Sequence, residues 1–291
     1  MNNQSLLVTG ASGHLGRLVL NELLARDPST RIVATTRHPG SLLGVAAKGV
    51  EVRYADFDDP ASLTTAFRGA SRALLVSTDA LGTPGQRITQ HATAIIALVA
   101  AGVEHIVYTS LPNPHGTPVV LGPDHAATEA NLLASGIGYT ILRNNLYADY
   151  LVPSLTEAVA SGQYVNARGS GRIAWVTRQD CAGAAAGALV AASGKAVLDV
   201  TGPAPLSSSD VAELVSELAQ KPVVHVSRSK EELRASMVGR GTPEALAALF
   251  TSLDDGVEKG LFANVSDTVQ RYAGRAPMSV RAFLANSPLA R

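Results

Sequence analysis

Short apolar runs alternate with amphipathic stretches along the first half of the chain. The runs hold four to six residues and predict buried strands at Leu6–Thr9, Arg31–Thr36, Val50–Tyr54, Arg72–Ser77, His105–Thr109 and Tyr139–Leu142. The stretches between them have the apolar spacing of helices and predict helices at His14–Arg26, Pro39–Lys48, Ala61–Phe67, Gln86–Ala101 and Asp124–Ser135. Strands separated by helices form a parallel sheet that is covered on both faces. We therefore expect an α/β fold built on a doubly wound parallel sheet.

The pattern changes after Arg143, where glycine and proline become frequent. We expect short strands within residues 161–177 and small helices at the end of the chain. Longer elements are predicted at Ser154–Ala160 (helix), Gln179–Ala191 (helix), Val197–Val200 (strand) and Ser208–Ala219 (helix). Residues 1–150 are predicted to form the sheet domain, with segments near 172–200 returning to it. Residues 151–291 are predicted to form a smaller C-terminal α/β part that closes over the sheet.

Composition and charge exclude several classes of protein. The chain has 24 basic and 24 acidic side chains among 291 residues, so neither a nucleic acid nor an anionic membrane is an expected partner. The longest apolar stretches, such as Ala92–Val103, are shorter than the roughly 20 residues that span a bilayer, and the N-terminus shows no leader pattern. The single cysteine, Cys181, excludes an internal disulfide and a cysteine-rich metal site. We expect a cytoplasmic protein without a metal, as a monomer or a homodimer.

The first strand runs directly into the glycine-rich turn "VTGASGHLG", with Gly10, Gly13 and Gly16 three residues apart. A pyrophosphate needs small residues here, because it must approach backbone N–H groups at a helix N-terminus. The first glycine permits the tight turn, the second leaves room for the phosphate, and the third lets the helix pack on the sheet. Ser12 adds a hydroxyl. An ordinary glycine-rich turn is the alternative, but the strand–turn–helix context favours a Rossmann domain that binds NAD(P).

The second strand ends in "ATTRHPG", which indicates the kind of dinucleotide. Proteins that prefer NADH usually place an acidic residue about 20 residues after the glycines, and residues 31–50 contain none. Arg37 stands in this region instead, and its guanidinium matches the 2′-phosphate of NADPH. A solvated arginine in a loop is the alternative. The expected cofactor is NADPH, with NADH less favoured.

Two further strand ends are predicted to line the same crevice. Asp56 and Phe57 follow the third strand and are expected at the edge and face of the adenine. Asp56 could instead cap the next helix, although Asp58 and Asp59 are better placed to do so. Ser77 and Thr78 follow the fourth strand and are expected along the ribose.

Several longer motifs resemble one family. "VTGASGHLG", Arg37, "AGVEHIVYTS", "HAATE", "YTILRNNLYADY" and "SGRIAWVTRQD" resemble the NmrA-like atypical short-chain dehydrogenase/reductases, and within them the bacterial type 2 NAD(P)H:quinone oxidoreductases and triphenylmethane reductases. The resemblance covers nearly the whole chain, including the C-terminal part that we expect to bind the substrate. It implies that Asn144, Asn145 and Tyr147 clamp the nicotinamide end, supported by Arg178. It implies cofactor contacts at Gly10, Ser12, Gly13, His14, Leu15, Arg37, Asp56 and the Ser77 region.

The sequence departs from the resemblance at two places. Position 14 is His where the relatives carry Gln, and the loop "TDALGTPGQR" differs from theirs. The second departure leaves the identity of the acceptor open.

The Tyr-x-x-x-Lys pair, by which short-chain dehydrogenases protonate ketones, is missing, because none of the seven tyrosines has lysine four residues later. The expected helix carries "HAATE" instead. His125 and Glu129 there either form a titratable pair that faces the crevice or a pair on the helix surface. Ser110 either contacts an oxyanion or caps the end of a strand.

The missing pair narrows the class of substrate. Hydride addition to a ketone leaves an alkoxide whose conjugate acid has a pKa of ~16, whereas addition to a quinone leaves a phenolate-like anion with a pKa of ~10. This difference of about six pKa units means that the anion from a quinone needs about 8 kcal/mol less stabilisation than the alkoxide. A triarylmethane cation leaves no anion at all. Hydrogen bonds from Asn145, Tyr147 or Ser110 would suffice for a quinone.

The sequence therefore predicts an NADPH-dependent oxidoreductase that acts on a small aromatic or quinonoid acceptor. Reduction of triarylmethane or azo dyes is one alternative. The other is a regulator of the NmrA type, which senses NADP(H) without turnover.

Overall fold

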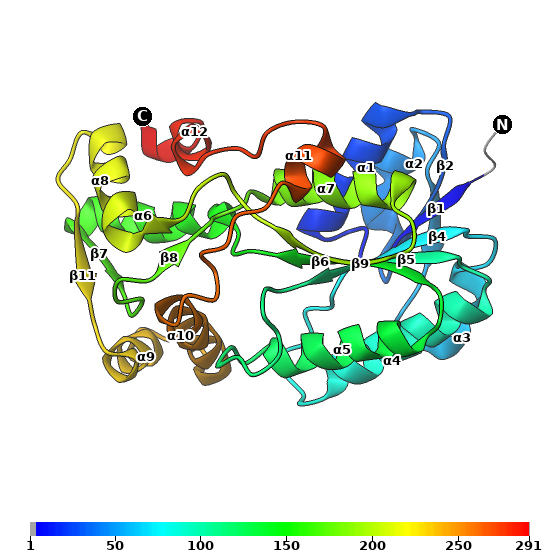
Figure 1. The fold of residues 1–291 in the computed structure, drawn as a ribbon, viewed down its shortest axis with the longest axis horizontal. Coiled ribbons are helices and arrows are strands. Elements are labelled where there is room, and N and C mark those ends of the chain that lie inside the picture. Colours follow the sequence, from blue (N-terminus) through cyan, green and yellow to red (C-terminus); the bar gives the residue numbers. More distant parts are fainter. Residues whose placement is uncertain (1–3, 291) are drawn as a thin grey trace.

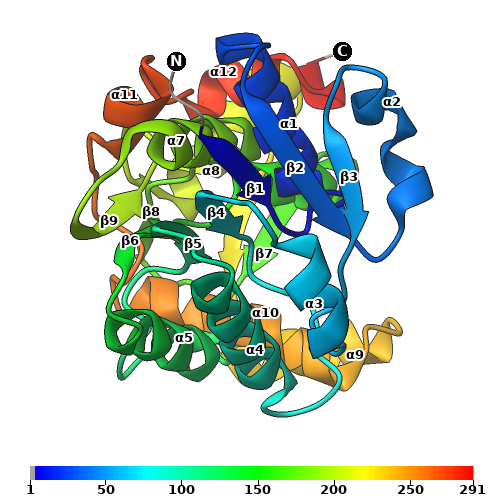
Figure 2. The same cartoon turned by 90° about the vertical axis from the view of Figure 1, so that its right-hand side faces the viewer.

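The computed structural model describes residues 4–290 and contains a sheet of seven parallel strands in the order β3-β2-β1-β4-β5-β6-β9 (Figures 1 and 2). The strands are β1 (Ser5–Val8), β2 (Arg31–Thr36), β3 (Glu51–Tyr54), β4 (Arg72–Leu75), β5 (His105–Ser110), β6 (Gly138–Asn144) and β9 (Lys195–Val200). The order reverses between β1 and β4, where doubly wound sheets bind their ligands. The predicted fold class is confirmed.

Helices cover both faces of this sheet (Figure 1). One face carries α1 (His14–Arg26), α7 (Arg178–Ala191) and α11 (Thr268–Ala273). The other carries α3 (Pro60–Ala66), α4 (Gln86–Ala100) and α5 (Gly122–Ala134). The alanine- and glycine-rich α7 is buried between α1 and α11 because its small side chains let both helices approach. A Cβ at Gly187 would lie 1.9 Å from the carbonyl oxygen of Tyr272, so only glycine fits there.

Most of the remaining elements form the annex, which lies beyond one end of the sheet (Figure 1). They are α6 (Leu151–Ser161), β7 (Gln163–Asn166), β8 (Arg172–Ile173), β10 (Leu206–Ser207), α8 (Ser208–Ala219), β11 (Val224–Ser227), α9 (Lys230–Gly239), α10 (Glu244–Glu258), α12 (Val280–Ala285) and η3 (Pro288–Ala290). Strand β7 pairs with β11 and β8 with β10. The annex has its own apolar core, which includes Leu155, Trp175, Phe262 and Leu284. In sequence, α7 and β9 come after the first annex elements, yet they belong to the layers of the large sheet.

The predicted elements all form, most of them with ends within two residues of the predicted ones, and three differences are larger. The helix predicted at Pro39–Lys48 is split into a 3-10 turn, η1 (Pro39–Leu42), and a short α2 (Leu43–Ala46). Helix α6 begins three residues earlier than predicted, at Leu151, because Pro153 is tolerated in a first turn. The helices expected to be small include α10, which has 15 residues, as many as α4.

Within residues 4–290, none of the helices combines the length and the apolar character that crossing a bilayer requires.

Candidate active site

A cleft of about 930 Å³ opens at the carboxyl ends of β1 to β4. Two of the residues predicted to contact the cofactor, Asn144 and Asn145, are not part of the cleft wall. The others line it, namely Gly10, Ser12, Gly13, His14, Leu15, Gly16, Arg37, Asp56, Phe57, Ser77, Thr78, Tyr147 and Arg178. The parallel strands bring these side chains together because their carboxyl ends meet at one edge of the sheet.

The glycine turn leaves an open anion site at the start of α1. Gly10 has φ +58°, which favours glycine. Gly13 precedes α1 with φ −72° and ψ 169°, a conformation that any residue adopts, so glycine is needed there for space rather than for flexibility. No side chain caps α1, and its first turn has no acidic residue. Its first N–H groups therefore point at the cleft without a partner from a capping side chain, as a pyrophosphate site requires.

Arg37 follows β2 and is exposed in the cleft wall. The turn beside it is held by Thr36, whose hydroxyl lies 2.7 Å from the Ser12 hydroxyl and accepts the His38 N–H at 3.1 Å. These bonds connect the glycine turn to the end of β2. Within residues 4–290, no carboxylate pairs with Arg37, so its guanidinium remains available for a phosphate.

The predicted adenine end of the cleft contains Asp56 and Phe57. The cap of α3 is Asp59, whose side chain accepts the N–H of Ala61 at 3.1 Å. Asp56 is therefore not the cap of this helix, and its carboxylate accepts the N–H of Asp58 at 3.0 Å.

Two residues of the cleft wall carry buried polar atoms that have no hydrogen-bond partner among residues 4–290. They are Thr78 Oγ1 and Gln90 Oε1. A third such atom, Asn144 Oδ1, lies on a neighbouring residue whose Nδ2 donates to the Tyr147 hydroxyl at 3.3 Å. Leaving a buried polar group unpaired costs about 1–3 kcal/mol. Together with the open glycine turn, these atoms fit a site that gains its missing partners from a bound dinucleotide.

Tyr147, Tyr150 and Arg178 form one stacked group in the cleft wall. The Arg178 guanidinium lies 4.8 Å from the Tyr147 ring centre and 4.7 Å from that of Tyr150. Asp149 holds this arginine through an ion pair of 3.3 Å and also accepts its backbone N–H at 2.9 Å. Burial raises the pKa of Tyr147, so its hydroxyl stays protonated and can donate a hydrogen bond. Tyr150 is 50% exposed and offers a flat aromatic surface.

A family model described as NAD(P)H-binding matches residues 10–191. The chain belongs to this family.

Several relatives are similar to this protein in sequence and structure over most of the chain. Quinone oxidoreductase 2 of Escherichia coli K12 is 36% identical, covering 92% of this chain and 93% of its own. Its crystal structure in complex with NADPH has a TM-score of 0.91, covering 96% of this chain and 98% of its own at 34% identity. Triphenylmethane reductase of Citrobacter sp. in complex with NADP(H) has a TM-score of 0.90, covering 97% and 100% at 34% identity. The resemblance seen in the motifs is confirmed.

Three of the residues predicted to be catalytic in this NAD(P)H-binding protein do not line the cleft. The Ser110 hydroxyl donates to Glu129 Oε1 at 2.7 Å. Asn145 donates from Nδ2 to the Phe262 carbonyl at 3.0 Å, a bond that connects the sheet to the annex. Its Oδ1 accepts the Leu146 N–H at 2.7 Å. Their catalytic roles stay predictions, without a contact to the cleft.

His125, the third of these residues, lies among buried groups with Glu129 nearby. Its Nδ1 is 2.8 Å from the Tyr108 hydroxyl and its Nε2 is 3.3 Å from Arg87. Burial lowers the pKa of His125 far below its usual value. Glu129 receives two bonds from Arg143, at 3.0 and 2.7 Å. The two groups thus form neither the crevice-facing pair nor the surface pair that the sequence suggested, because α5 packs this face against β5 and α4.

The cleft wall also contains residues that the sequence analysis missed. Thr109, rather than Ser110, faces the cleft. Successive strand residues point to opposite faces, so the alternation along β5 could have indicated one of the two as the cleft residue. Gln90 and the neighbouring His91 lie on the buried face of α4, where nothing in the sequence distinguishes them from core residues.

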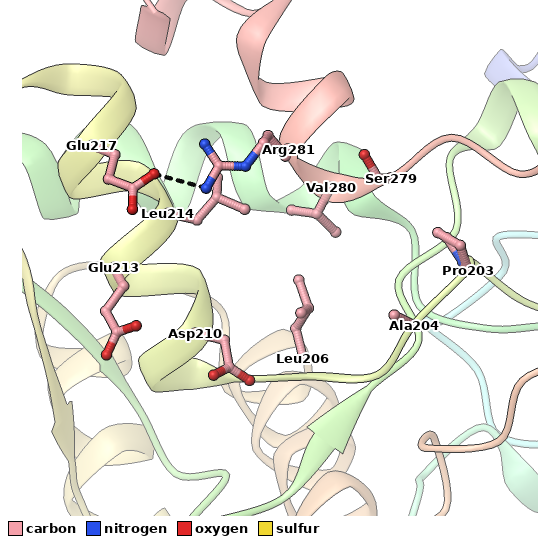
Figure 3. Close-up of a pocket in the computed structure, with 10 residues that line it drawn as sticks. All are labelled: Pro203, Ala204, Leu206, Asp210, Glu213, Leu214, Glu217, Ser279, Val280 and Arg281. Atoms are coloured by element: carbon pink, nitrogen blue, oxygen red, sulfur yellow. Dashed lines mark hydrogen bonds and ion pairs between the residues drawn. The ribbon is translucent and has the colours of Figure 1, made fainter.

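A second pocket, of about 470 Å³, lies in the annex between α8 and α12 (Figure 3). Asp210, Glu213 and Glu217 line it opposite Arg281, which pairs with Glu217 at 2.7 Å (Figure 3). Both members of this pair are exposed, and exposed pairs contribute little. The pocket shares no residue with the cleft. The cleft at the glycine turn contains the residues predicted to bind the cofactor and is therefore the candidate active site.

Proposed function

We propose that this protein is an NADPH-dependent oxidoreductase that transfers hydride to a quinone or a similar extended conjugated acceptor. One observation carries the proposal. A dinucleotide cleft ends beside Tyr147 and Tyr150, and neither tyrosine has the lysine partner that ketone reduction requires.

Bound NADPH supplies the hydride. The residues of the chain bind it and hold the acceptor. The N–H groups after Gly13 bind the pyrophosphate, and Arg37 binds the 2′-phosphate. Phe57 packs on the adenine, while Thr78 and Gln90 provide acceptors for the donors of the cofactor. Positioning of this kind contributes several kcal/mol to catalysis without any proton transfer.

The reacting end of the cleft suits an acceptor that needs no strong acid. Tyr147 stays protonated, and its hydroxyl, which accepts a hydrogen bond from Asn144 Nδ2, donates one to a developing phenolate-like oxygen. The exposed Tyr150 ring, backed by Arg178, gives a planar acceptor a surface to stack on. A simple ketone would leave an anion that costs about 8 kcal/mol more to stabilise, for which these groups are insufficient.

The relatives support this class of acceptor. Quinones and triphenylmethane dyes are named for the two relatives above, and an NAD(P)H azoreductase of Xenophilus azovorans is 27% identical over 96% of both chains. All three acceptors are extended conjugated molecules. Dye reduction is therefore the second candidate for this cleft. Cytoplasmic location stays our prediction.

A panel of acceptors tests the proposal. The purified protein is mixed with NADPH and, in turn, a quinone, a triarylmethane dye, an azo dye and a simple ketone, and the loss of NADPH absorbance is followed. We expect oxidation with the conjugated acceptors and none with the ketone. If NADPH binds but no acceptor oxidises it, the protein is a sensor of NADP(H) instead.

Arg37→Ala is expected to weaken NADPH binding about 10- to 100-fold, because one or two charge-assisted hydrogen bonds are lost. NADH lacks the 2′-phosphate, so its affinity should barely change. Titration calorimetry with both dinucleotides measures the effect. Arg31→Ala is the matched control, since Arg31 is an exposed arginine at the opposite end of the same strand, paired with Glu51 at 3.1 Å. An unchanged preference in Arg37→Ala would refute the phosphate contact.

A further inference from the structure

Three consecutive backbone N–H groups follow β4, and each is held by a side chain from a different element. They belong to residues 76–78, which line the cleft. The bonds run from Val76 N to Thr9 Oγ1 (3.0 Å), from Ser77 N to Thr109 Oγ1 (2.9 Å) and from Thr78 N to His91 Nε2 (2.9 Å). These bonds hold the backbone of this segment of the cleft wall in place.

His91 is held in one orientation and one tautomer. Its Nε2 accepts the Thr78 N–H, so the ring proton is on Nδ1 and is donated to the Thr128 hydroxyl at 2.9 Å. That hydroxyl donates in turn to the Asp124 carbonyl at 2.8 Å. The ring is 0% exposed and meets Tyr108 edge to face, with ring centres 5.7 Å apart. Helix α5, which lacks the Tyr–Lys pair, thus contributes Thr128 as the support for this histidine.

We propose that His91 is a positioning residue for the cofactor. Its ring holds the Thr78 amide, and through it the Ser77–Thr78 segment, so that the unpaired Thr78 Oγ1 is ready to accept a donor from the nicotinamide half of NADPH. The inference rests on the proposed function, because it requires that the dinucleotide occupies this cleft. Without the ring, the Thr78 N–H would lose its acceptor, and the segment would no longer be held in this position.

Three variants test this role. His91→Leu removes the acceptor, whereas His91→Gln restores it, because glutamine Oε1 reaches the position of the histidine Nε2. His105→Leu is the matched control, since His105 is also buried and its Nε2 lies 2.9 Å from the Thr140 hydroxyl, away from the cleft.

Calorimetry of NADPH binding and thermal unfolding are measured for each variant. We expect His91→Leu to raise the Kd for NADPH about tenfold, a change that corresponds to about 1.4 kcal/mol. His91→Gln should stay within about threefold of the parent. His105→Leu should lower the unfolding temperature as His91→Leu does, but leave the Kd unchanged. If His91→Leu does not fold, His91→Gln is compared with His91→Asn, whose shorter side chain reaches only the Nδ1 position.

The positioning role is overturned if His91→Leu binds NADPH as tightly as the parent, or if His105→Leu weakens binding equally. It is also overturned if His91→Gln fails to restore affinity in a folded protein. These outcomes differ from failure of the proposed function. In that case the parent protein itself does not bind NADPH, or it binds NADPH but none of the acceptors in the panel oxidises it.

Discussion

Gly13→Val is expected to weaken NADPH binding by at least about 100-fold in a protein that still folds, because the valine side chain displaces the phosphate from two backbone N–H groups. The backbone angles at Gly13 suit valine, and a Cβ there would meet only the Gly10 carbonyl oxygen, at 3.3 Å. The cost in stability should be about 1 kcal/mol, from a poorer helix cap. Titration calorimetry measures the affinity, and urea unfolding measures the stability.

Gly16→Ala provides the contrast in the same turn. A Cβ at Gly16 would lie 2.4 Å from the Gly10 carbonyl oxygen and 2.8 Å from Ala11 Cα, both of which are backbone atoms that cannot move aside. This variant should lose stability rather than only affinity, since α1 must shift away from the sheet. If folded Gly13→Val binds NADPH as the parent does, the pyrophosphate does not lie on this turn.

Acidification is expected to unfold the protein at an unusually mild pH, because three histidines are buried in their neutral form. Burial is the main cause in each case. It lowers the pKa of His91 to about 3, with Arg87 adding to the effect, and that of His105 to about 4, with Arg72 adding to it. Burial also lowers the pKa of His125 well below its usual value, again with Arg87 nearby.

The sign of the effect follows from proton binding. Below the ordinary histidine pKa of about 6.5, the unfolded chain takes up protons that the folded protein excludes, so stability falls as the pH falls. Each histidine contributes about 1.4 kcal/mol per pH unit, hence about 4 kcal/mol per unit for the three together. By pH 5 the loss is about 6 kcal/mol, within the 5–15 kcal/mol of a typical domain.

Urea unfolding between pH 7.5 and 5 measures this slope. His105→Leu should reduce it by about one third, whereas His38→Gln, at an exposed position of the cleft, should leave it unchanged. A slope near zero between pH 6.5 and 5.5 would show that the buried histidines take up protons without unfolding.

The local features of this protein were determined by its sequence. Strand and helix positions follow from apolar periodicity, which acts over a few residues. Two further features are also local, namely the turn at Gly10, Gly13 and Gly16 and the absence of an acidic residue beside Arg37. Each depends only on which side chains fit next to the backbone or the phosphate at one place. These features were sufficient for the doubly wound sheet and for an NADPH cleft.

The tertiary structure decided which side chains face the cleft. Ser110 and Thr109 are neighbours on one strand, and only the packing of β5 against α5 directs Ser110 to Glu129 and leaves Thr109 in the wall. His91 and Thr78 are 13 residues apart, and the bond between them depends on how α4 lies along the sheet. Strand β9 pairs with β6, although part of the annex lies between the two strands in the sequence. Such contacts depend on the relative placement of distant segments, on which local periodicity carries no information.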